Sequence, residues 1–474
     1  MSKVRIPFGK QIQKWLVKYP DLVFDGTVIK CLPCETHLPM WSVIQCRNHV
    51  NSKRHIQSQE RQWPYMKFLS DLMFMLSVCD LPFVMPIEES FRVFWNKYVP
   101  MWKLPPRKTM YRKLQLIRQM VENHIRSKVA NRKIWITIDK TTDIYNRKVI
   151  NVLIRPMRSN QSSVPYLIAS KKLKNVTAES ITGVVQNAIA RFGIHKNNVL
   201  MLVTDITECM LEAGKSLKDF YPKLLHVTCM LQTLHLVEVQ IRDGYSDIDK
   251  LISSTKTVFE SSTKRTNTFR KRCPGIPQPP DLIGTRWKPW LEAVFYYHTY
   301  FDQVKSFVLE MDPNDAQSIE TSKQLFEDPQ VRNNLHTLYN NYTPLSNAIK
   351  QLQDSTSSLS ASLSAISNVI CSLQLQTVMD ITGMLARETL HDNLDKSPDY
   401  SKLCAIDQSS LYGNSSVDDK YFRYANMTCI NMEHPFLTHI STFSPRHKAL
   451  TETTIEALLM FEMFSRSHPA LCQQ

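Results

Sequence analysis

Residues 134–139 read Ile-Trp-Ile-Thr-Ile-Asp, and this stretch decides how the middle of the chain is interpreted. It is rich in β-branched and aromatic residues, which favour a buried strand, and it ends in a carboxylate. Further apolar runs of strand length predict strands at 149–157, 164–169, 199–204 and 224–228. Helical periodicity predicts helices at 177–192, 207–217 and 230–242.

The predicted order of these elements is βββαβαβα. Three meandering strands followed by alternating strands and helices predict a mixed sheet covered by helices. That order matches the RNase H-like fold. The first helix should begin near Thr177, where Thr177 to Ser180 form a capping-box pattern that is one residue off the ideal.

Two acids stand where predicted strands end, Asp139 after the first and Asp205 after the fourth. In an RNase H-like sheet these strands are neighbours. Two carboxylates held together can bind Mg²⁺ and promote phosphodiester chemistry, so both are candidate catalytic residues. The alternative remains open, because an Asp at a strand end is also a common turn or helix cap.

A metal-ligand pattern lies near the N-terminus. Cys31 and Cys34 are separated by two residues, and His49 and His55 follow at a spacing typical of zinc sites. Residues 22–30 are predicted to form a short hairpin and residues 43–57 a helix, which makes a ββα zinc finger. Four protein ligands leave no open position for a catalytic water, so we expect the Zn²⁺ to be structural.

The ligand set has alternatives, and its helix is basic. His37 and Cys46 are spare candidate ligands, and two chance cysteines near a helix remain the simplest competing explanation. The exposed cations of the predicted helix, Arg47, Lys53 and Arg54, are candidate DNA contacts.

Charge is concentrated at this end of the chain. Residues 1–133 hold 23 Lys and Arg against 9 Asp and Glu, a net charge of +14, whereas the whole chain carries +15. Such a segment attracts polyanions, although a solvated basic face would have the same composition. We expect phosphate contacts from a second basic group, Arg107, Lys108, Arg112 and Lys113.

Other classes of protein find no support in the composition. Only 10 of 474 residues are Gly, and no glycine-rich nucleotide-binding motif occurs. No run of about 18 apolar residues predicts a membrane span, and no N-terminal signal sequence is found. The 11 cysteines are irregularly spaced and should be reduced, in cytosol or nucleus.

The remainder of the chain is predicted to be mainly helical. Helices are expected at 329–352 and 355–375, and a polar loop at 392–419. The cations Lys264, Arg265 and those at 270–272 form a cluster that suits a nuclear-import signal or a DNA contact as well as an ordinary charged loop.

The N-terminal segment resembles the BED-like finger of the CGG triplet-repeat-binding protein family. The likeness covers about residues 10–130 and rests on KCLPCETHLPMWSVIQCRNHVNSKRH, residues 30–55, and on the helical stretch that follows.

The next part of the chain, roughly residues 134–450, resembles hAT transposases. ITIDKTTD (136–143) and VTDITECM (203–210) look like the first-acid and second-acid motifs of that family. Other motifs follow in the family's order: HVTCMLQTLHLV (226–237), GTRWKPW (284–290), YTPLSNAIKQLQ (342–353) and STFSPRHKAL (441–450). The resemblance implies an RNase H-like core with a helical insertion.

Several departures from the family pattern bear on activity. Gln232 replaces a His three residues after Cys229, and Ser444 replaces the Asp of an LDPRxK motif. No motif for the family's third acid is found, and nothing marks Glu388, Glu452 or Glu456 as its replacement. We therefore expect the chain not to be an active transposase, with Mg²⁺ bound only if the acid site is active.

The sequence thus predicts an α+β multidomain protein of four regions. These are a BED-like zinc finger (1–62), a helical basic linker (63–132), an RNase H-like core (133–295) and a helical insertion-like region (296–474) that looks truncated. The leading interpretation is a nuclear, zinc-dependent protein that binds double-stranded DNA, descends from a domesticated transposon and regulates transcription. The alternatives are an active or partner-assisted transposase and a protein-interaction module. Whether the chain forms homo-oligomers stays open.

Overall fold

A computed structural model describes most of the chain. The described residues are 19, 22–24, 28–31, 34, 36–38, 43–79, 81, 85–143, 145–280, 290–375, 381–411, 417–429 and 451–468. Two motifs that resemble hAT transposases lie outside them, at 284–289 and 441–450. The side chain of Arg107 also lies outside the description.

The N-terminal unit is a small sheet followed by two helices. Strands β1 (Leu22–Phe24), β2 (Ile29–Cys31) and β3 (His37–Leu38) pair antiparallel in that order. Its core consists of four fully buried side chains: Leu22, Ile29, Cys31 and Cys46. The hairpin predicted at 22–30 is confirmed, and β3 extends it by a strand that the sequence did not suggest.

The prediction of a single helix at 43–57 is wrong, because this range contains parts of two helices. Helix α2 (Val43–Val50) ends before Asn51, and a second helix, α3 (Lys53–Val78), begins two residues later. The break occurs because Ser52 caps α3, its Oγ accepting a hydrogen bond from the His55 N–H at 3.2 Å.

The linker after the finger is helical, as expected. It continues from α3 through a 3₁₀ turn, η1 (Met85–Ile87), to helices α4 (Glu89–Tyr98) and α5 (Arg107–Val129). Arg92 fixes the turns around α4 by donating hydrogen bonds to the carbonyls of Pro86, Leu104 and Pro105.

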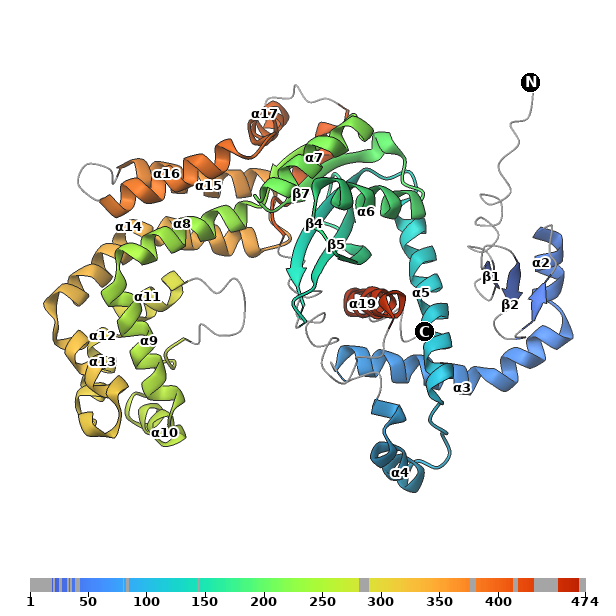
Figure 1. Ribbon diagram of the computed structural model, residues 1–474, viewed down its shortest axis with the longest axis horizontal. Coiled ribbons are helices and arrows are strands. Elements are labelled where there is room, and N and C mark those ends of the chain that lie inside the picture. Colours follow the sequence, from blue (N-terminus) through green and yellow to red (C-terminus); the bar gives the residue numbers. More distant parts are fainter. Residues whose placement is uncertain are drawn as a thin grey trace.

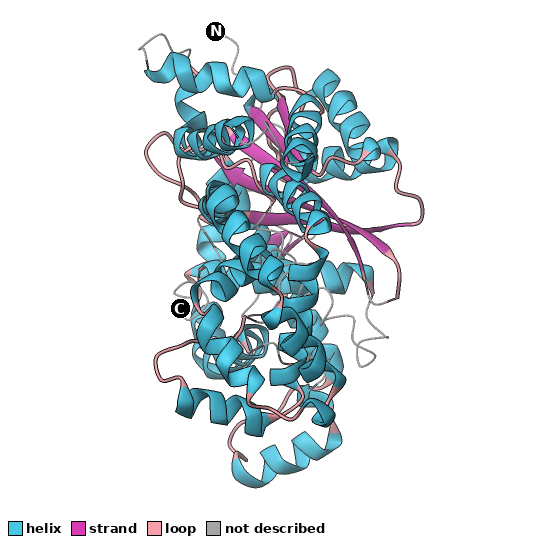
Figure 2. Ribbon diagram, turned by 90° about the vertical axis from the view of Figure 1, so that its left-hand side faces the viewer, coloured by secondary structure: helices cyan, strands magenta, loops and turns pink. Residues whose placement is uncertain are grey.

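The centre of the molecule is a five-stranded mixed sheet (Figure 2). Its strands are β4 (Ile134–Thr142), β5 (Lys148–Pro156), β6 (Tyr166–Leu173), β7 (Val199–Thr204) and β8 (Leu225–Thr228). The order across the sheet is β6-β5-β4-β7-β8. Strand β5 pairs antiparallel with both β4 and β6. Strand β7 pairs parallel with both β4 and β8. The predicted RNase H-like α/β core is confirmed.

Two helices cover one face of this sheet. Helix α6 (Ala178–Arg191) packs on β5 and β6, and α7 (Glu208–Phe220) packs on β7 and β8. Helix α6 has the capping box that the sequence suggested, with Ser180 as its second partner: the Thr177 N–H donates to Ser180 Oγ and the Ser180 N–H to Thr177 Oγ1. A short 3₁₀ turn, η2 (Lys196–Asn198), leads into β7.

The last described helix, α19 (Glu452–Ser467), covers the outer edge of the sheet. Figure 1 shows this helix, in red, beside α5 and the sheet. Its Glu456 and Glu452, one helical turn apart, accept hydrogen bonds from the Ser170 and Lys172 N–H groups of edge strand β6. A strand edge with unpaired N–H groups invites pairing with other chains, and the two carboxylates satisfy these donors.

A long helical region leaves the sheet after β8 and extends away from it (Figure 1). Its helices are α8 (Met230–Gly244), α9 (Ser246–Glu260), α10 (Thr263–Arg272), α11 (Trp290–Thr299), α12 (Phe301–Leu309), α13 (Gln317–Glu327), α14 (Pro329–Gln353), α15 (Leu359–Leu375), α16 (Ile381–Asp395) and α17 (Tyr400–Leu411), with 3₁₀ turns η3 (Pro313–Asp315) and η4 (Asp419–Tyr424).

One prediction for this region fails. The loop predicted at 392–419 contains the end of α16 and the whole of α17, because Leu394 and Leu403 supply buried contacts within a polar stretch. In the part of the chain that the structure describes, no helix is long and apolar enough to cross a membrane.

Candidate metal centre

Four side chains of the N-terminal unit converge on one point. Each of Cys31, Cys34, His49 and His55 offers one potential ligand atom, and these atoms all lie within 4.8 Å of one another. Cys31 and His55 are buried, and Cys34 and His49 are half-buried. They are the four residues that the sequence spacing selected, and together they could hold a metal ion such as Zn²⁺.

The separations suit a tetrahedral ion. His55 Nδ1 lies 3.2 Å from Cys31 Sγ, 3.6 Å from Cys34 Sγ and 3.3 Å from His49 Nε2. Usual Zn–S and Zn–N bond lengths place ligand atoms about 3.3–3.8 Å apart at tetrahedral angles. Burial, with the nearby His55 and Arg54, lowers the pKa of His49, which favours the neutral imidazole that binds metal.

Local backbone structure brings the ligands together. Cys31 ends β2, and the Cys34 N–H points back to Cys31 Sγ at 3.4 Å, as in a tight knuckle between β2 and β3. His49 lies in the last turn of α2 and His55 in the first turn of α3. The break between these helices therefore turns both imidazoles toward the cysteines.

The two spare ligands lie outside this cluster. His37 is exposed on β3, where it pairs with Lys30 of β2. Cys46 is fully buried among Leu22, Ile29 and Cys31, and burial raises the pKa of its thiol. A neutral, apolar environment suits a core thiol and disfavours the thiolate that a metal needs.

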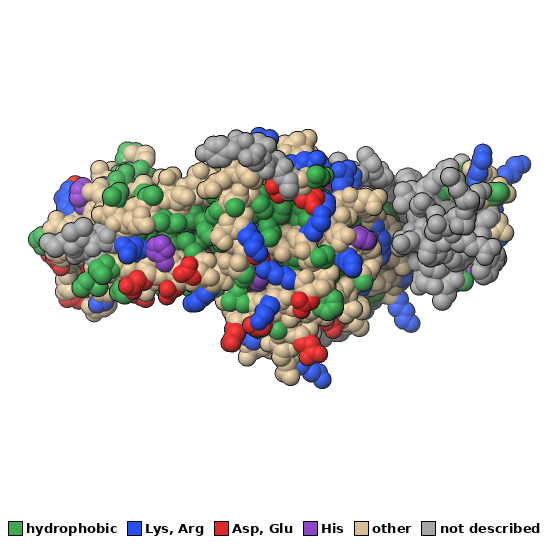
Figure 3. All heavy atoms as spheres, turned by 90° about the horizontal axis from the view of Figure 1, so that it is seen from above, with side chains coloured by type: hydrophobic (Ala, Val, Ile, Leu, Met, Phe, Trp, Pro, Cys, Tyr) green, Lys and Arg blue, Asp and Glu red, His purple; other side chains and the backbone are tan. Residues whose placement is uncertain are grey.

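The cations next to the cluster face solvent. Arg47 on α2 and Lys53 and Arg54 at the start of α3 are all exposed. Figure 3 shows blue Lys and Arg side chains projecting at this end of the molecule, on the right. Each lies within two residues of a clustered histidine, so the ligand cluster would fix the helices that carry them.

The second basic group begins α5. Lys108 and Arg112 are exposed there, whereas Lys113 is half-buried and burial lowers its pKa. Arg107 starts the helix, but its side chain lies outside the described residues. Lys108 and Arg112 are therefore better placed for a partner than Lys113.

Asp205 directly follows β7, as predicted, but the prediction that Asp139 ends its strand is wrong, because β4 continues through pairing with β5 to Thr142. Thr137 of β4 aligns with Val203 of β7, so Asp139 and Asp205, each two residues further on, lie at the same end of the sheet. Asp139 is buried. Asp205 Oδ1 accepts hydrogen bonds from the Thr207 N–H, at 2.9 Å, and from the Thr207 hydroxyl, which is the role of a turn-capping Asp.

No third acid joins this pair among the described residues, where the finger supplies the only group of three or more potential metal ligands. Glu388 is exposed on α16. Glu456 is fully buried at the β6 edge, within 3.4 Å of Arg118, Lys171 and Arg191. Glu452 binds the same edge, so none of the three candidates adds a ligand to the acid pair.

Sequence reasoning missed a buried polar row beside Asp139. Asn151 of β5 aligns with Asp139, and Ser170 of β6 aligns with Asn151, so the three share one face of the sheet. The Asn151 amide and the Ser170 hydroxyl are buried without a hydrogen-bond partner. The signal in the sequence was Asn151, a polar amide inside the strand predicted at 149–157.

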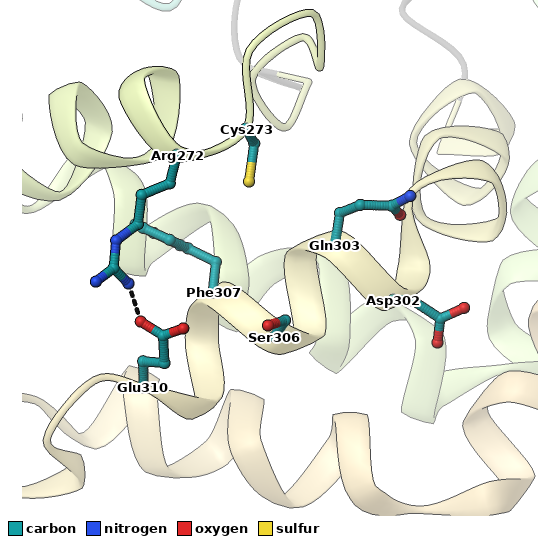
Figure 4. Close-up of a pocket in the computed structure, with 7 residues that line it drawn as sticks. All are labelled: Arg272, Cys273, Asp302, Gln303, Ser306, Phe307 and Glu310. Carbon is teal, nitrogen blue, oxygen red and sulfur yellow. Dashed lines mark ion pairs between the residues drawn. The ribbon is translucent and has the colours of Figure 1, made fainter.

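A pocket of about 380 Å³ lies in the helical region (Figure 4), and its lining, among the described residues, does not contain a cluster of metal ligands like that of the finger. Arg272 and Glu310 form an ion pair across it, so the cation already has a partner. Arg265 of the same basic cluster lies 3.8 Å from Asp315. The other lining residues are Cys273, Asp302, Gln303, Ser306 and Phe307.

Comparison with known families concerns the core. The family model of a domain of unknown function, DUF659, matches residues 107–260, from α5 to the end of α9. The chain contains a DUF659 domain. This domain is a region associated with hAT transposases, and here it carries both Asp139 and Asp205. No curated protein matches the chain.

Proposed function

We propose that this protein is a nuclear, zinc-dependent binder of double-stranded DNA that derives from a hAT transposase and acts as a regulator without cutting DNA. The observation that carries the proposal is the convergence of Cys31, Cys34, His49 and His55, with ligand atoms within 4.8 Å of one another, beside exposed cations on the two helices that carry the histidines.

A metal held by these side chains would make the finger rigid. Zn²⁺ supplies the cross-link, and the chain supplies orientation: His49 fixes the end of α2 and His55 fixes the start of α3. Arg47, Lys53 and Arg54 then project from a fixed frame. Guanidinium and ammonium groups contact guanine edges and phosphates in this way, and rigid supports favour specific recognition.

The basic start of α5 supports a second contact. Lys108 and Arg112 are exposed and belong to the first 133 residues, which carry a net charge of +14. Phosphate contacts spread over the finger and α5 would add affinity without sequence preference, because counterion release does not depend on the bases.

The absence of cutting rests on the acid pair. Asp205 caps a turn, and the three glutamates considered as a third acid lie elsewhere in the described structure. The resemblance to hAT transposases implies a set of three acids, and the described residues supply two of them here. The close placement of Asp139 and Asp205 nevertheless favours one second candidate, a partner-assisted transposase, and a cleavage assay decides between the two.

The test is DNA binding by the purified, zinc-loaded protein, measured by fluorescence anisotropy over a range of salt concentrations. We expect the triple variant Arg47→Ala, Lys53→Ala, Arg54→Ala to bind more weakly and to lose about one unit of salt slope per phosphate contact removed. The matched control removes three exposed lysines elsewhere, Lys196→Ala, Lys215→Ala, Lys250→Ala.

Each outcome bears on the proposal. Weaker binding in the finger variant, with the control unchanged, supports it. Equal losses in both variants mean general basic adhesion and overturn specific recognition by the finger. No binding by the unaltered protein favours a protein-interaction module, for which Ile44 and Ile56, exposed on the same helices, would be the contacts. Mg²⁺-dependent nicking that Asp139→Ala abolishes would establish the enzyme instead.

A further inference from the structure

Two buried cysteines meet beside the acid pair, although 200 residues separate them in the sequence. Cys229 follows the end of β8, and Cys429 lies in the segment that returns from the helical region. The Cys429 N–H donates to Cys229 Sγ at 3.2 Å, and the Met230 N–H donates to the Met427 carbonyl at 2.8 Å. These bonds hold the returning segment against the start of α8.

The surroundings of Cys229 favour a thiolate. Cys229 is the N-cap residue of α8, where the partial positive charge of the helix dipole favours an anion. The neighbouring Cys429 thiol, with the nearby N–H groups of Gln232, Cys429 and Leu231, lowers the pKa of Cys229 against the opposing effect of burial. A thiolate with this support is the form that attacks electrophiles.

Cys429 has the opposite character. Its hydrogen bond to Cys229, its burial and the nearby carboxylates of Asp139 and Asp205 raise the pKa of its thiol. The backbone bond from Cys429 to Cys229 Sγ brings the two residues together, and two neighbouring thiols can be oxidised to a disulfide through a sulfenic acid.

The two cysteines also lie at opposite ends of the helical region in the sequence. Every described residue from α8 to η4 lies between the two cysteines. A bond between them would join the start of the helical region to its end, where both meet the sheet. The covalent link would close a loop that includes the whole region.

We propose that Cys229 and Cys429 form an oxidation site at which a small hydroperoxide closes a disulfide across the base of the helical region. The Cys229 sulfur attacks the terminal oxygen of the hydroperoxide, the O–O bond breaks, and a sulfenic acid forms with release of the alcohol, or of water when the oxidant is hydrogen peroxide. The Cys429 sulfur then attacks the Cys229 sulfur, the S–O bond breaks, and the hydroxyl leaves as water with the Cys429 proton. Two thiols are oxidised and one peroxide is reduced.

The experiment treats the zinc-loaded full chain with hydrogen peroxide, blocks remaining thiols, and maps peptides by mass spectrometry with and without reductant. We expect one reductant-sensitive cross-link between the peptides that contain Cys229 and Cys429. Because closing a long loop restricts the unfolded chain, we also expect the Tm of the oxidised protein to rise by about 5 °C, reversibly.

Variants distinguish the site from general oxidation. Cys229→Ala and Cys429→Ala should each abolish both the cross-link and the rise in Tm, whereas Cys371→Ala, which removes an exposed cysteine of α15, should change neither. The proposal is overturned if Cys229 and Cys429 stay reduced while the exposed Cys79 and Cys371 are oxidised. It is also overturned if the two buried thiols form separate sulfinic acids without a cross-link.

Discussion

In the finger, four side chains from one strand, the turn after it and two helices converge on one point, whereas in the sheet two acids lie side by side and one already caps a turn. Both clusters have the residue types that a metal prefers. The difference is convergence: each finger ligand has its donor atom within 4.8 Å of the other three. The sheet therefore keeps its strand order and its two neighbouring acids, while among the described residues only the finger brings three or more potential metal ligands together.

The largest expected effect comes from the finger ligands. Cys34→Ala should reduce bound zinc from one ion per chain to almost none and unfold the finger, because structural zinc contributes on the order of 10 kcal/mol or more in small fingers. Elemental analysis and the spectrum of the Co²⁺-substituted protein measure this change.

Cys46→Ala is the matched control for that experiment. Cys46 is buried in the finger core but lies outside the ligand cluster. We expect the variant to keep its zinc and to lose only packing stability. Equal loss of zinc in both variants would contradict the assignment of ligands.

A second effect concerns the charged cluster that holds α19 to the sheet. Glu456→Gln removes the fully buried carboxylate that the partly buried Arg118, Lys171 and Arg191 share, and of these three cations only Arg118 keeps another carboxylate partner among the described residues, Glu122. We expect a loss of about 3–5 kcal/mol in the free energy of unfolding, measured by denaturant titration.

Glu452→Gln provides the comparison, because Glu452 is exposed and, among the described residues, accepts a hydrogen bond from the Lys172 N–H alone. Its loss should stay below about 1 kcal/mol. Similar losses in the two variants would mean that the buried cluster does not hold the helix in place.

The sheet should also weaken in mild acid through His226. Burial, with the nearby Lys218, lowers the pKa of His226 to about 4 against the opposing effect of Asp399. The unfolded chain, whose histidine has a pKa of about 6.5, takes up the proton first, so stability falls as pH drops below that value. The loss from this group is about 2 kcal/mol between pH 7 and pH 5.

Denaturant titrations at both pH values test this expectation. His226→Gln should reduce the pH dependence by about that amount, whatever its effect on absolute stability. An unchanged difference between pH 7 and pH 5 would show that another group controls the acid response.

The smallest expected effect is at the acid pair. Asp205→Asn keeps the side-chain acceptor for the Thr207 N–H, so we expect less than about 1 kcal/mol of lost stability and unchanged DNA binding. Asp139→Asn should likewise leave DNA binding unchanged. A Mg²⁺-dependent rise in Tm that either variant abolishes would contradict the view that this pair is incomplete.

The order of strands and helices along the chain and the four clustered ligands of the finger were predictable, because both depend on local sequence patterns. The apolar run at 199–204 and the Thr177–Ser180 cap specify their elements without reference to distant residues. The break at Asn51–Ser52 was missed because the helical pattern continues through it, and only the Ser52 cap separates the two helices.

Long-range contacts could not be predicted from such patterns. Nothing in the sequence links Cys229 to Cys429, or Glu456 to Ser170, across 200 and 286 residues. The role of Glu456 was open for the same reason. The sequence does not show which strand lies beside its helix, so it does not show that the Glu456 carboxylate accepts a hydrogen bond from the backbone of β6.

The most direct test of the central claim is selection from a random duplex library by the zinc-loaded protein, in parallel with Cys34→Ala. We expect a consensus sequence with the unaltered protein and none with the variant, because the finger ligands fix the helices that carry Arg47, Lys53 and Arg54. The same consensus from both proteins would contradict the claim that a metal-ordered finger recognises DNA.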